Sequence, residues 1–377
     1  MSGSYGLLIG GSAADDDIMQ ALTNLEVEEA ADSPGAVSLD LNVARGEDGE
    51  LSFVGDSRIG PFTSIAVVAT PEGGDPQCIF DGYVLQHRLQ VDPGTTNSRL
   101  NVWGQDASWL MNVQETVQEW VDVSDNDVAE AIFSNYGIAT ADANSNEDSP
   151  THSEDRHSLM QRDTDIRFLQ ELARRSGKLC RVYCEDQPGQ RTGFFAAPSL
   201  DGDPVATLVL TDPEAANVES LSFHWDVARP TEVDAREALF DDSNEDGTDA
   251  EVDDAGLKLL ADRGLADFAG QSTTSLLTTV ADSADELHLR ALAAVRSSHW
   301  FVRCEGSTTV SRLQTVLRVG DLVAVSGIGK LNSGKYLVWN VRHAIDGETH
   351  RMQFSLVRNA VGPAPTSSVL GMLGGLI

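Results

Sequence analysis

Lysine is scarce in this chain of 377 residues, and basic residues of either kind are few. Against 26 basic residues stand 59 acidic ones, giving a formal net charge of -33, and lysine occurs only at Lys178, Lys258, Lys330 and Lys335. We expect no sequence-specific nucleic-acid binding, because no basic stripe is present to release counterions from phosphates. The acidic residues are interleaved with apolar strand and helix patterns, which indicates a folded body with a carboxylate-rich surface.

Two explanations of the acidity compete. One is the capture of cations or the repulsion of anionic partners. The other is adaptation to molar salt, where the Debye length shrinks to roughly 3 Å and like charges tolerate one another. The shortage of lysine favours the second explanation and predicts a host that keeps salt in its cytoplasm.

Cysteine and long apolar runs are also rare. The four cysteines Cys78, Cys180, Cys184 and Cys304 are too few for a disulfide framework in a chain of this size, and no nearby Cys/His pair completes a zinc set with Cys180 and Cys184. We expect buried thiols. No stretch of 18 apolar residues predicts a membrane span, and no signal peptide is evident, so we expect folding in the cytoplasm.

Sequence motifs of hydrolases are missing as well. The eight histidines are scattered, with no His-Glu-x-x-His run and no Gly-x-Ser-x-Gly elbow. We therefore expect no enzymatic activity and no catalytic residues. Two alternatives from other classes stay open, namely a secreted or surface calcium-binding β-protein and an acidic hydrolase.

Most of the chain reads as antiparallel β-structure. Apolar residues alternate in segments 25–27, 37–41, 65–67, 78–84 and 100–103, and again near the other end at 316, 322–325, 336–341 and 352–356. Between them, Ser124 and Asp127 predict the start of a helix that ends at Gly137, and a second helix is predicted over 164–175 before Gly177. Further strands are expected at 179–183 and 206–210, and Ser283 and Glu286 predict the start of a third helix.

Two distant segments resemble each other. Residues 81–84 (DGYV) lead to His87, an acidic glycine turn and a strand near Arg99, while residues 333–336 (SGKY) lead to His343, a similar turn and a strand near Arg351. Such an echo predicts two copies of one β-unit with an insert between them.

The acidic loop 241–254 has the spacing of a calcium loop. Oxygen-bearing side chains at alternate positions around Gly247 would supply the ligands, which are Asp242, Asn244, Asp246 and Asp253. The last ligand is Asp rather than a bidentate Glu, so a solvated loop without metal is the competing interpretation. No other cofactor is expected.

Two further segments are candidate interfaces. Basic residues concentrate around the second helix, including Arg162, Arg167, Arg174 and Arg175. They either pair with local acids or form a docking surface for an acidic neighbour. The apolar C-terminal segment, with Leu370, Met372, Leu373, Leu376 and Ile377, is either a loose end or an interface.

Three stretches resemble the late-control-protein-D family of phage baseplate hubs, which is related to the front half of type VI secretion spike proteins. The first is 79–84 (IFDGYV) followed by 104–110 (GQDASWL). The second and most specific is 160–173 (MQRDTDIRFLQELA) with Gly177, which departs from the family pattern at Arg162. The third runs from 320–323 (GDLV) through Tyr336 and His343 to 354–359 (FSLVRN).

This resemblance implies a mainly β, α+β fold: two tandem tail-tube-like antiparallel β-barrels with an inserted α+β domain. The expected divisions are a first barrel (1–110), the insert (111–215), a second barrel (216–361) and a linker with an apolar tail (362–377).

It also implies a homotrimeric hub between a sixfold tail tube and a threefold spike, with a channel for genome or cargo. The expected neighbours are the tail tube protein, the spike or tip protein, and baseplate wedge and tape-measure proteins. The expected location is the baseplate of a virion or injection particle that assembles in the host cytoplasm. We expect an acidic channel wall, which would not hold DNA, and the hydrolase alternative becomes a tail-associated hydrolase.

Overall fold

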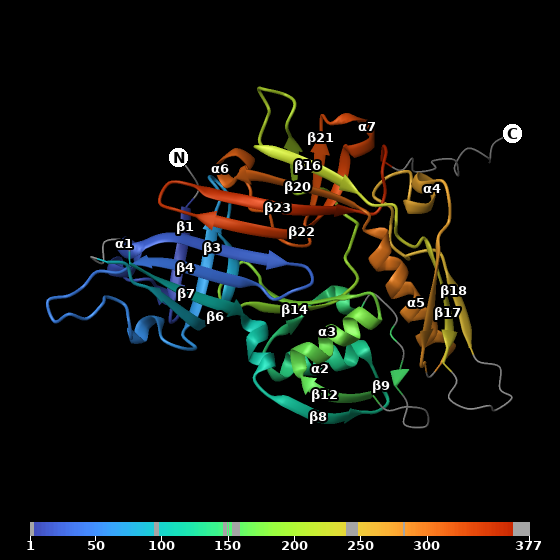
Figure 1. The fold of residues 1–377 in the computed structure, drawn as a ribbon, viewed down its shortest axis with the longest axis horizontal. Helices are drawn as coiled ribbons and strands as arrows, with labels where there is room; N and C mark the ends of the chain where they lie inside the picture. Colours follow the sequence, from blue (N-terminus) through green and yellow to red (C-terminus); the bar gives the residue numbers. More distant parts are fainter. Residues whose placement is uncertain are drawn as a thin grey trace, which may run out of the picture.

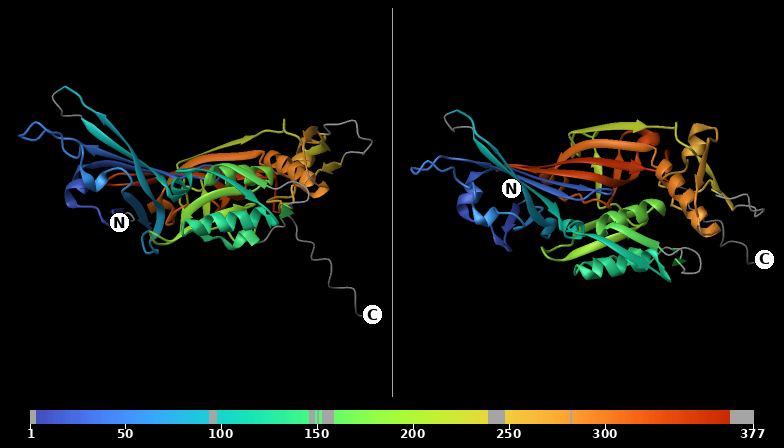
Figure 2. Two further views of the ribbon diagram at one scale, coloured as in Figure 1. Left: turned by 90° about the horizontal axis from the view of Figure 1, so that it is seen from below. Right: turned by 60° about the horizontal axis from the view of Figure 1, so that its bottom comes forward.

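A sheet of 13 strands forms the body of the protein in the computed structural model (Figure 1). The structure describes residues 4–93, 98–145, 149, 151–152, 159–238, 248–281 and 283–364. A middle region with two helices lies below this sheet in Figure 1, and a small three-stranded sheet with a long helix lies at its end. The β6–β7 hairpin projects from the opposite end (Figure 2).

Strands from the first part of the chain make up one half of the large sheet, and each predicted strand there is confirmed. The alternation of apolar residues buries Leu25, Val27, Leu39 and Leu41 on one face. A short helix, α1 (Asp16–Ala21), precedes the third strand. The strands are β1 (Ser4–Ile9), β2 (Ser12–Ala13), β3 (Leu22–Ala30), β4 (Ala36–Asn42), β5 (Ser64–Thr70), β6 (Gln77–Gln90) and β7 (Arg99–Asp106).

Strands from later parts of the chain make up the other half. The strand prediction at Val316 is wrong, since that residue lies in the connection after α6 (Val310–Leu313), but the other three C-terminal predictions are confirmed. The strands are β15 (Ala206–Val209), β16 (Ser220–Trp225), β20 (Val302–Thr309), β21 (Leu322–Ser326), β22 (Gly334–Ile345) and β23 (His350–Arg358). A one-turn helix, α7 (Gly329–Asn332), joins β21 to β22.

The two halves share one strand order. The first runs β3-β4-β7-β6-β5-β1 across the sheet, and the second runs β16-β20-β23-β22-β21-β15. The first strand along the chain in one half therefore has the same position in the sheet as the first strand in the other half, and the same holds for each later strand. A β-bulge interrupts β6 between Val84 and Gln86, and another interrupts β22 between Val338 and Asn340. Bulges are specific features of a strand rather than accidents, so this match supports a duplicated unit. Aligning the bulges places Val84 with Val338. The echo in the sequence had aligned Val84 with Tyr336, so the structural alignment is displaced from it by two residues.

The halves differ in one pairing and do not form the predicted tandem barrels. β1 runs antiparallel to β5, whereas β15 runs parallel to β21. Among the described residues, no strand pairing closes a barrel. Instead β22 pairs with β21 through residues 334–337 and with β3 through residues 340–345, so the halves merge into one sheet over a shared apolar core.

The middle region has its own core, and both predicted helices there are confirmed. The α2 helix begins after a capping box between Ser124 and Asp127, and α3 ends before Gly177, which has a φ of 66°. Buried residues of α2, α3 and β13 pack together. The elements are η2 (Ala107–Asn112), β8 (Glu115–Trp120), β9 (Val123–Ser124), α2 (Asp125–Asn135), β10 (Ala139–Thr140), η3 (Asp142–Ser145), β11 (Thr151–His152), β12 (Leu159–Thr164), α3 (Asp165–Arg175), β13 (Leu179–Cys184) and β14 (Arg191–Ala196).

One predicted element of the insert belongs elsewhere. β15 falls inside the range 111–215 that we assigned to the insert, yet it pairs with β21 of the large sheet. The reason is Leu208, which is fully buried in the core that both halves share.

A small sheet packs on the third predicted helix. The helix α5 (Ala284–His299) begins where Ser283 accepts a hydrogen bond from the amide of Glu286, as predicted. The sheet consists of β17 (Glu232–Glu237), β18 (Asp249–Val252) and β19 (Thr274–Thr279). β18 lies inside the predicted acidic loop 241–254, a correction that follows from the burial of Val252 against α5. A short helix, α4 (Leu265–Ala269), precedes β19.

Candidate assembly site

The duplicated sheet ends in strand edges that no described strand covers. β6 pairs with β5 only up to Tyr83, and beyond the bulge it pairs only with β7. β16 pairs only with β20. Unpaired edges present rows of backbone donors and acceptors and are templates for another strand.

Apolar side chains accumulate on these same edges. Leu89 is 40% exposed on β6, and Val91 just beyond it is 50% exposed. Trp225 on β16 is 47% exposed and packs edge-on against Phe268. Exposed apolar side chains beside an unpaired strand edge make these edges candidate contact surfaces.

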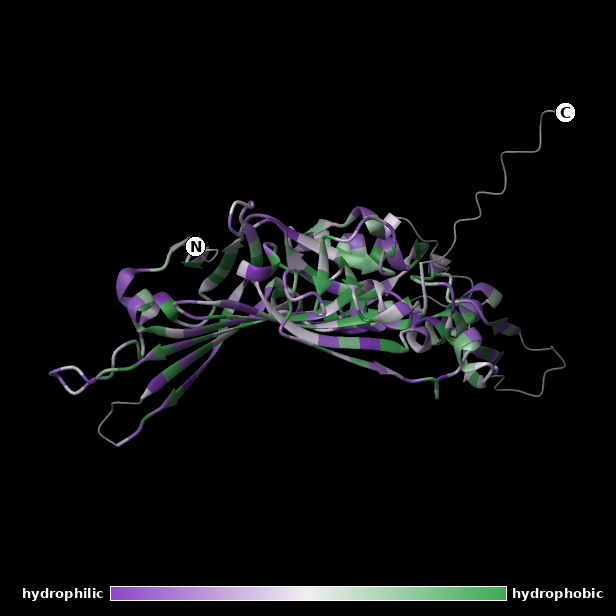
Figure 3. Ribbon diagram, turned by 90° about the horizontal axis from the view of Figure 1, so that it is seen from above, coloured by the Kyte–Doolittle hydropathy of each residue, from purple (hydrophilic) through white to green (hydrophobic). Residues whose placement is uncertain are grey.

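The sheet face turned away from the shared core is polar, and its charges nearly balance. Strand ribbons alternate between hydrophobic and hydrophilic residues (Figure 3). By strand register, the basic side chains on this face are Arg88, Arg99, Arg303, Lys335, Arg342 and Arg351, and the acidic ones are Glu26, Glu28, Asp40, Asp81 and Glu305. This face is therefore close to neutral, although the chain as a whole is strongly acidic.

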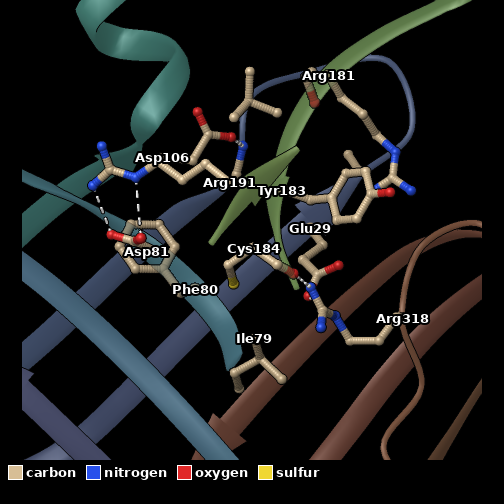
Figure 4. Close-up of a pocket in the computed structure, with 14 residues that line it drawn as sticks. Glu29, Ile79, Phe80, Asp81, Asp106, Arg181, Tyr183, Cys184, Arg191 and Arg318 are labelled. Atoms are coloured by element: carbon tan, nitrogen blue, oxygen red, sulfur yellow. Dashed lines mark hydrogen bonds and ion pairs between the residues drawn. The ribbon is translucent and has the colours of Figure 1, made fainter. Parts of the chain in front are cut away.

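A buried ion pair joins the large sheet to the middle region. The guanidinium of Arg191 on β14 donates from Nε and Nη2 to the carboxylate of Asp81 on β6, at 3.0 and 2.9 Å (Figure 4). The amide of Gly189 donates to the same carboxylate, and Tyr83 lies under the guanidinium. Although burial lowers the pKa of Arg191, hydrogen bonds with Asp81 and Tyr83 raise it above its ordinary value. A bidentate geometry of this kind fixes orientation as well as charge.

A second ion pair lies beside the first. Arg318 donates from Nε to Glu29 at 2.6 Å and from Nη2 to the carbonyl of Cys184. Arg181 donates to the carbonyl of Val319 and stacks over Tyr183. The sheet, the β13 strand and the segment before β21 are thus held together by two arginines that are mostly buried.

Between the ion pairs lies a cavity of about 30 Å³, large enough for about one water molecule. Asp106 lines it and accepts hydrogen bonds from the amides of Gly35 and Ser108. Burial raises the pKa of Asp106 to about 6, although those hydrogen bonds act in the opposite direction. The site is too small for a substrate, and its groups are engaged with one another, so the arrangement serves to fix the joint.

The predicted basic residues separate into different places. Arg162 on β12 and Arg167 and Arg174 on α3 are exposed, and Arg167 lies 3.7 Å from Asp163. Arg175 is half-buried and pairs with Glu286 of α5 at 3.2 Å. Local pairing therefore accounts for part of this cluster only.

The other predicted sites fall largely outside the described residues. Asp242, Asn244 and Asp246 lie there, as do all five apolar tail residues, Leu370, Met372, Leu373, Leu376 and Ile377. Asp253 is exposed just after β18. Within the described part, no group of three or more His, Cys, Asp or Glu side chains could hold a metal.

The cysteine prediction is confirmed, since all four thiols are free and buried. Burial raises the pKa of both Cys180 and Cys304 to about 12, which makes them poor nucleophiles. Over the described ranges, no helix has both the length and the apolar composition that crossing a membrane requires.

Sequence reasoning missed the charged joint. Asp81 lies in the stretch 79–84 that resembles baseplate hubs, but its partner Arg191 lies 110 residues away. The sequence offered one signal, the glycine at position 82 next to Asp81. In the structure, a Cβ at Gly82 would lie 2.0 Å from the carbonyl oxygen of Gln105. A glycine forced by such a close backbone approach indicates that its neighbours are held in fixed positions.

A family model described as the Alg8 N-terminal domain matches residues 6–347. The chain belongs to this family. No curated protein sequence matches the chain significantly.

Solved structures with the same fold include tail proteins. The 43 kDa tail protein of prophage MuSo2 from Shewanella oneidensis is 14% identical, with 96% of this chain and 100% of that chain covered and a TM-score of 0.63. A tail protein from Neisseria meningitidis MC58 is 15% identical, with 95% and 97% covered and a TM-score of 0.62. The Escherichia coli c3393 protein, a component of the type VI secretion system, is 11% identical, with 95% and 79% covered and a TM-score of 0.56. At these identities the likeness shows the fold, and the more specific likeness to late-control protein D stays a prediction.

Proposed function

We propose that this protein is a structural subunit at the tail tip of a tailed virus or contractile injection system, without enzymatic activity. Three copies form a ring that adapts a sixfold tail tube to a threefold spike and surrounds a passage for genome or cargo. The fold shared with tail proteins supports this role. The single observation that carries the ring is the duplicated strand order with one joint made and an equivalent joint left open.

The joint already made lies inside the chain. Residues 340–345 of β22 pair antiparallel with β3, placing His343 opposite Val27 and Ala344 opposite Glu26. Arg342 forms an ion pair with Glu26, and Asn340 donates to Glu28 at 3.3 Å. This contact shows how the second half of the chain adds to the first.

The open joint would repeat this strand pairing between two copies of the chain, with β6 of the first half in the place of β22 and β16 of the second half in the place of β3. By the shared strand order and the matching bulges, β6 corresponds to β22 and β16 corresponds to β3. Pairing β6 of one copy with β16 of the next places Leu89 opposite Phe223 and Gln90 opposite Ser222. The exposed Leu89 and Trp225 are then covered.

Such a contact is heterologous, because two different surfaces of the chain meet. Heterologous contacts produce rings when the rotation closes. Three copies with two units each give six similar units around an axis, which is the symmetry that a hexameric tube and a threefold spike require. The near-neutral polar face is the wall of the passage in this arrangement, and it neither traps nor strongly repels an anionic cargo.

The neighbours in the particle follow from this position. We propose the tail tube protein on one side and a spike or tip protein on the other, with wedge and tape-measure proteins nearby, in the baseplate of a particle assembled in the cytoplasm of a salt-accumulating host. The acidic composition of the chain supports the salt-accumulating host.

Mass measurement of the purified protein in molar KCl tests the oligomer. We expect a particle three times the 40.4 kDa chain mass, at protein concentrations where a Leu89→Lys variant is monomeric. A wild-type protein that stays monomeric at the highest soluble concentration, or that forms a twofold dimer, overturns the ring.

A further inference from the structure

A large cavity between α3, α5 and the end of the large sheet is basic, in contrast to the rest of the molecule. Its volume is about 600 Å³, within the usual range for binding pockets. Basic side chains from four separate parts of the chain line it: Arg174, Arg175, Lys178, Arg229, Arg290, Arg296 and Arg303. Asp32 is the one acidic residue among the lining residues. The chain as a whole has more than two acidic residues for each basic one, so this reversal is local.

Carboxylates behind the lining neutralise only part of this charge. Glu286 pairs with Arg175 at 3.2 Å and also with Arg290, and Asp226 pairs with Arg229 at 3.3 Å. Arg174 and Arg303 are both exposed, and no carboxylate of the described residues lies within ion-pair distance of either. Arg174 and Arg303 therefore bring positive charge to the cavity that no ion pair among the described residues offsets.

Apolar side chains also line the cavity. Trp300 and Trp339 pack at 5.8 Å between ring centroids, and Leu257 and Val357 continue the same surface. A ligand with apolar groups as well as negative charge would match both parts of the cavity.

We propose that this cavity binds an acidic peptide segment of a partner protein, one that carries an apolar or aromatic side chain between carboxylates. Arginine presents a planar fork that matches a carboxylate, and several such forks around an apolar floor suit a chain of alternating character. The inference does not depend on the ring, because all lining residues come from one chain.

The helices argue for carboxylates rather than phosphates. Phosphate sites typically use the amide groups and positive dipole at a helix N-terminus. Here α3 contributes Arg174 and Arg175 from its last turn, and α5 contributes Arg290 from its middle and Arg296 and Ser297 from its last turn. The negative ends of both helix dipoles therefore face this region, which disfavours a multiply charged phosphate more than dispersed carboxylates.

Binding of a labelled peptide to the full chain tests the proposal. The probe is a fluorescein-labelled Glu-Glu-Phe-Glu-Glu peptide, followed by fluorescence anisotropy at about 0.1 M salt, where surface charges are only partly screened. We expect saturable binding that weakens at least about tenfold in the R174Q/R303Q variant, since two charge-assisted contacts are lost. Both side chains are exposed, so the variant should fold, and circular dichroism checks that it does.

Matched controls decide the interpretation. R236Q/R312Q removes the same charge from two exposed arginines outside the cavity and should leave affinity unchanged. A Gln-Gln-Phe-Gln-Gln peptide should bind at least about tenfold more weakly than the acidic one. The proposal is overturned if the two peptides bind equally, if R174Q/R303Q binds like wild type, or if inorganic polyphosphate binds the cavity while the acidic peptide does not.

Discussion

The carboxylate of Asp81 and the guanidinium of Arg191 meet in two parallel contacts of 3.0 and 2.9 Å, joining residues 110 positions apart. Their side chains are 5% and 16% exposed. This pair fixes the middle region against the large sheet. It also provides a direct test of the joint.

Replacing Arg191 by Met should lower the free energy of unfolding by about 3 to 5 kcal/mol, because it leaves Asp81 buried without a cation. Chemical denaturation measures the change. Adding D81N to R191M should recover part of the loss. The matched control is K258M, which breaks an exposed pair with Asp201 (61% and 77% exposed) and should cost less than about 1 kcal/mol. Equal effects of the two single variants would contradict a buried joint.

Asp106 should make stability fall as pH rises from about 4 to about 6. Its folded pKa of about 6 exceeds the ordinary value of 3.8 because of burial, so the folded state holds the proton more tightly over that interval. About two units of difference correspond to roughly 3 kcal/mol, lost by the time pH 6 is passed. In D106N this loss should be absent. Denaturation of both proteins at a series of pH values gives the comparison, and a difference between them that does not vary with pH would refute the assignment.

The imidazoles of His343 and His350 contact each other at 3.0 Å between Nδ1 and Nε2. Burial lowers the pKa of His350 to about 4 and that of His343 well below its ordinary value. Both folded-state values are depressed, so the unfolded chain binds protons first on acidification. Stability is fully present above about pH 6.5 and is lost as pH falls toward 4.

The H350Q variant should flatten this acid loss, as measured by thermal unfolding at pH 7 and pH 5. His288, exposed on α5, is the matched position, and H288Q should keep the wild-type slope. Between about pH 4 and pH 6 Asp106 changes the stability in the opposite direction from the histidine pair. The H350Q variant is therefore compared with wild type at each pH. A parallel shift of the H350Q curve, with its slope unchanged, would show that the pair does not titrate as described.

Gly82 should tolerate no side chain. A Cβ there would lie 2.0 Å from the carbonyl oxygen of Gln105 on the neighbouring strand, with no flexible group to move aside. We expect G82A to destabilise the protein by about 3 kcal/mol, since backbone must shift. Gly6 on β1 has open space around its Cβ position, and G6A should change the free energy of unfolding by less than about 1 kcal/mol. Denaturant titration of both variants checks the contrast.

Local signals in the sequence predicted local structure well. The cap at Ser124 and the glycine stop at Gly177 fixed the helices α2 and α3, because capping depends on a few adjacent residues. The β8–β12 pair was missed because β8 is polar and exposes Val117, so no apolar alternation marks it. β18 was also missed, because it forms where Val252 packs on α5, a contact that the acidic local sequence does not indicate.

Long-range relationships needed the structure. The echo between the halves indicated duplication, but its register was displaced by two residues because a bulge, invisible in sequence, sets the alignment. The merging of β22 with β3 joins residues more than 300 positions apart, as Asn340 and Glu28 show. No local pattern in either strand specifies that choice over a closed barrel.

Disulfide cross-linking between copies tests the open joint most directly. With Gln90→Cys and Ser222→Cys in one chain, oxidation should produce covalent trimers, because these side chains face each other in the proposed β6–β16 pairing. The native cysteines are all buried and should not interfere. Gln86→Cys with Ser222→Cys is the matched control, displaced by four residues or about 13 Å along the strand, and should not cross-link. Efficient trimer formation in the first variant alone is the predicted result; equal cross-linking in both, or none in either under conditions where the protein is oligomeric, would contradict the ring.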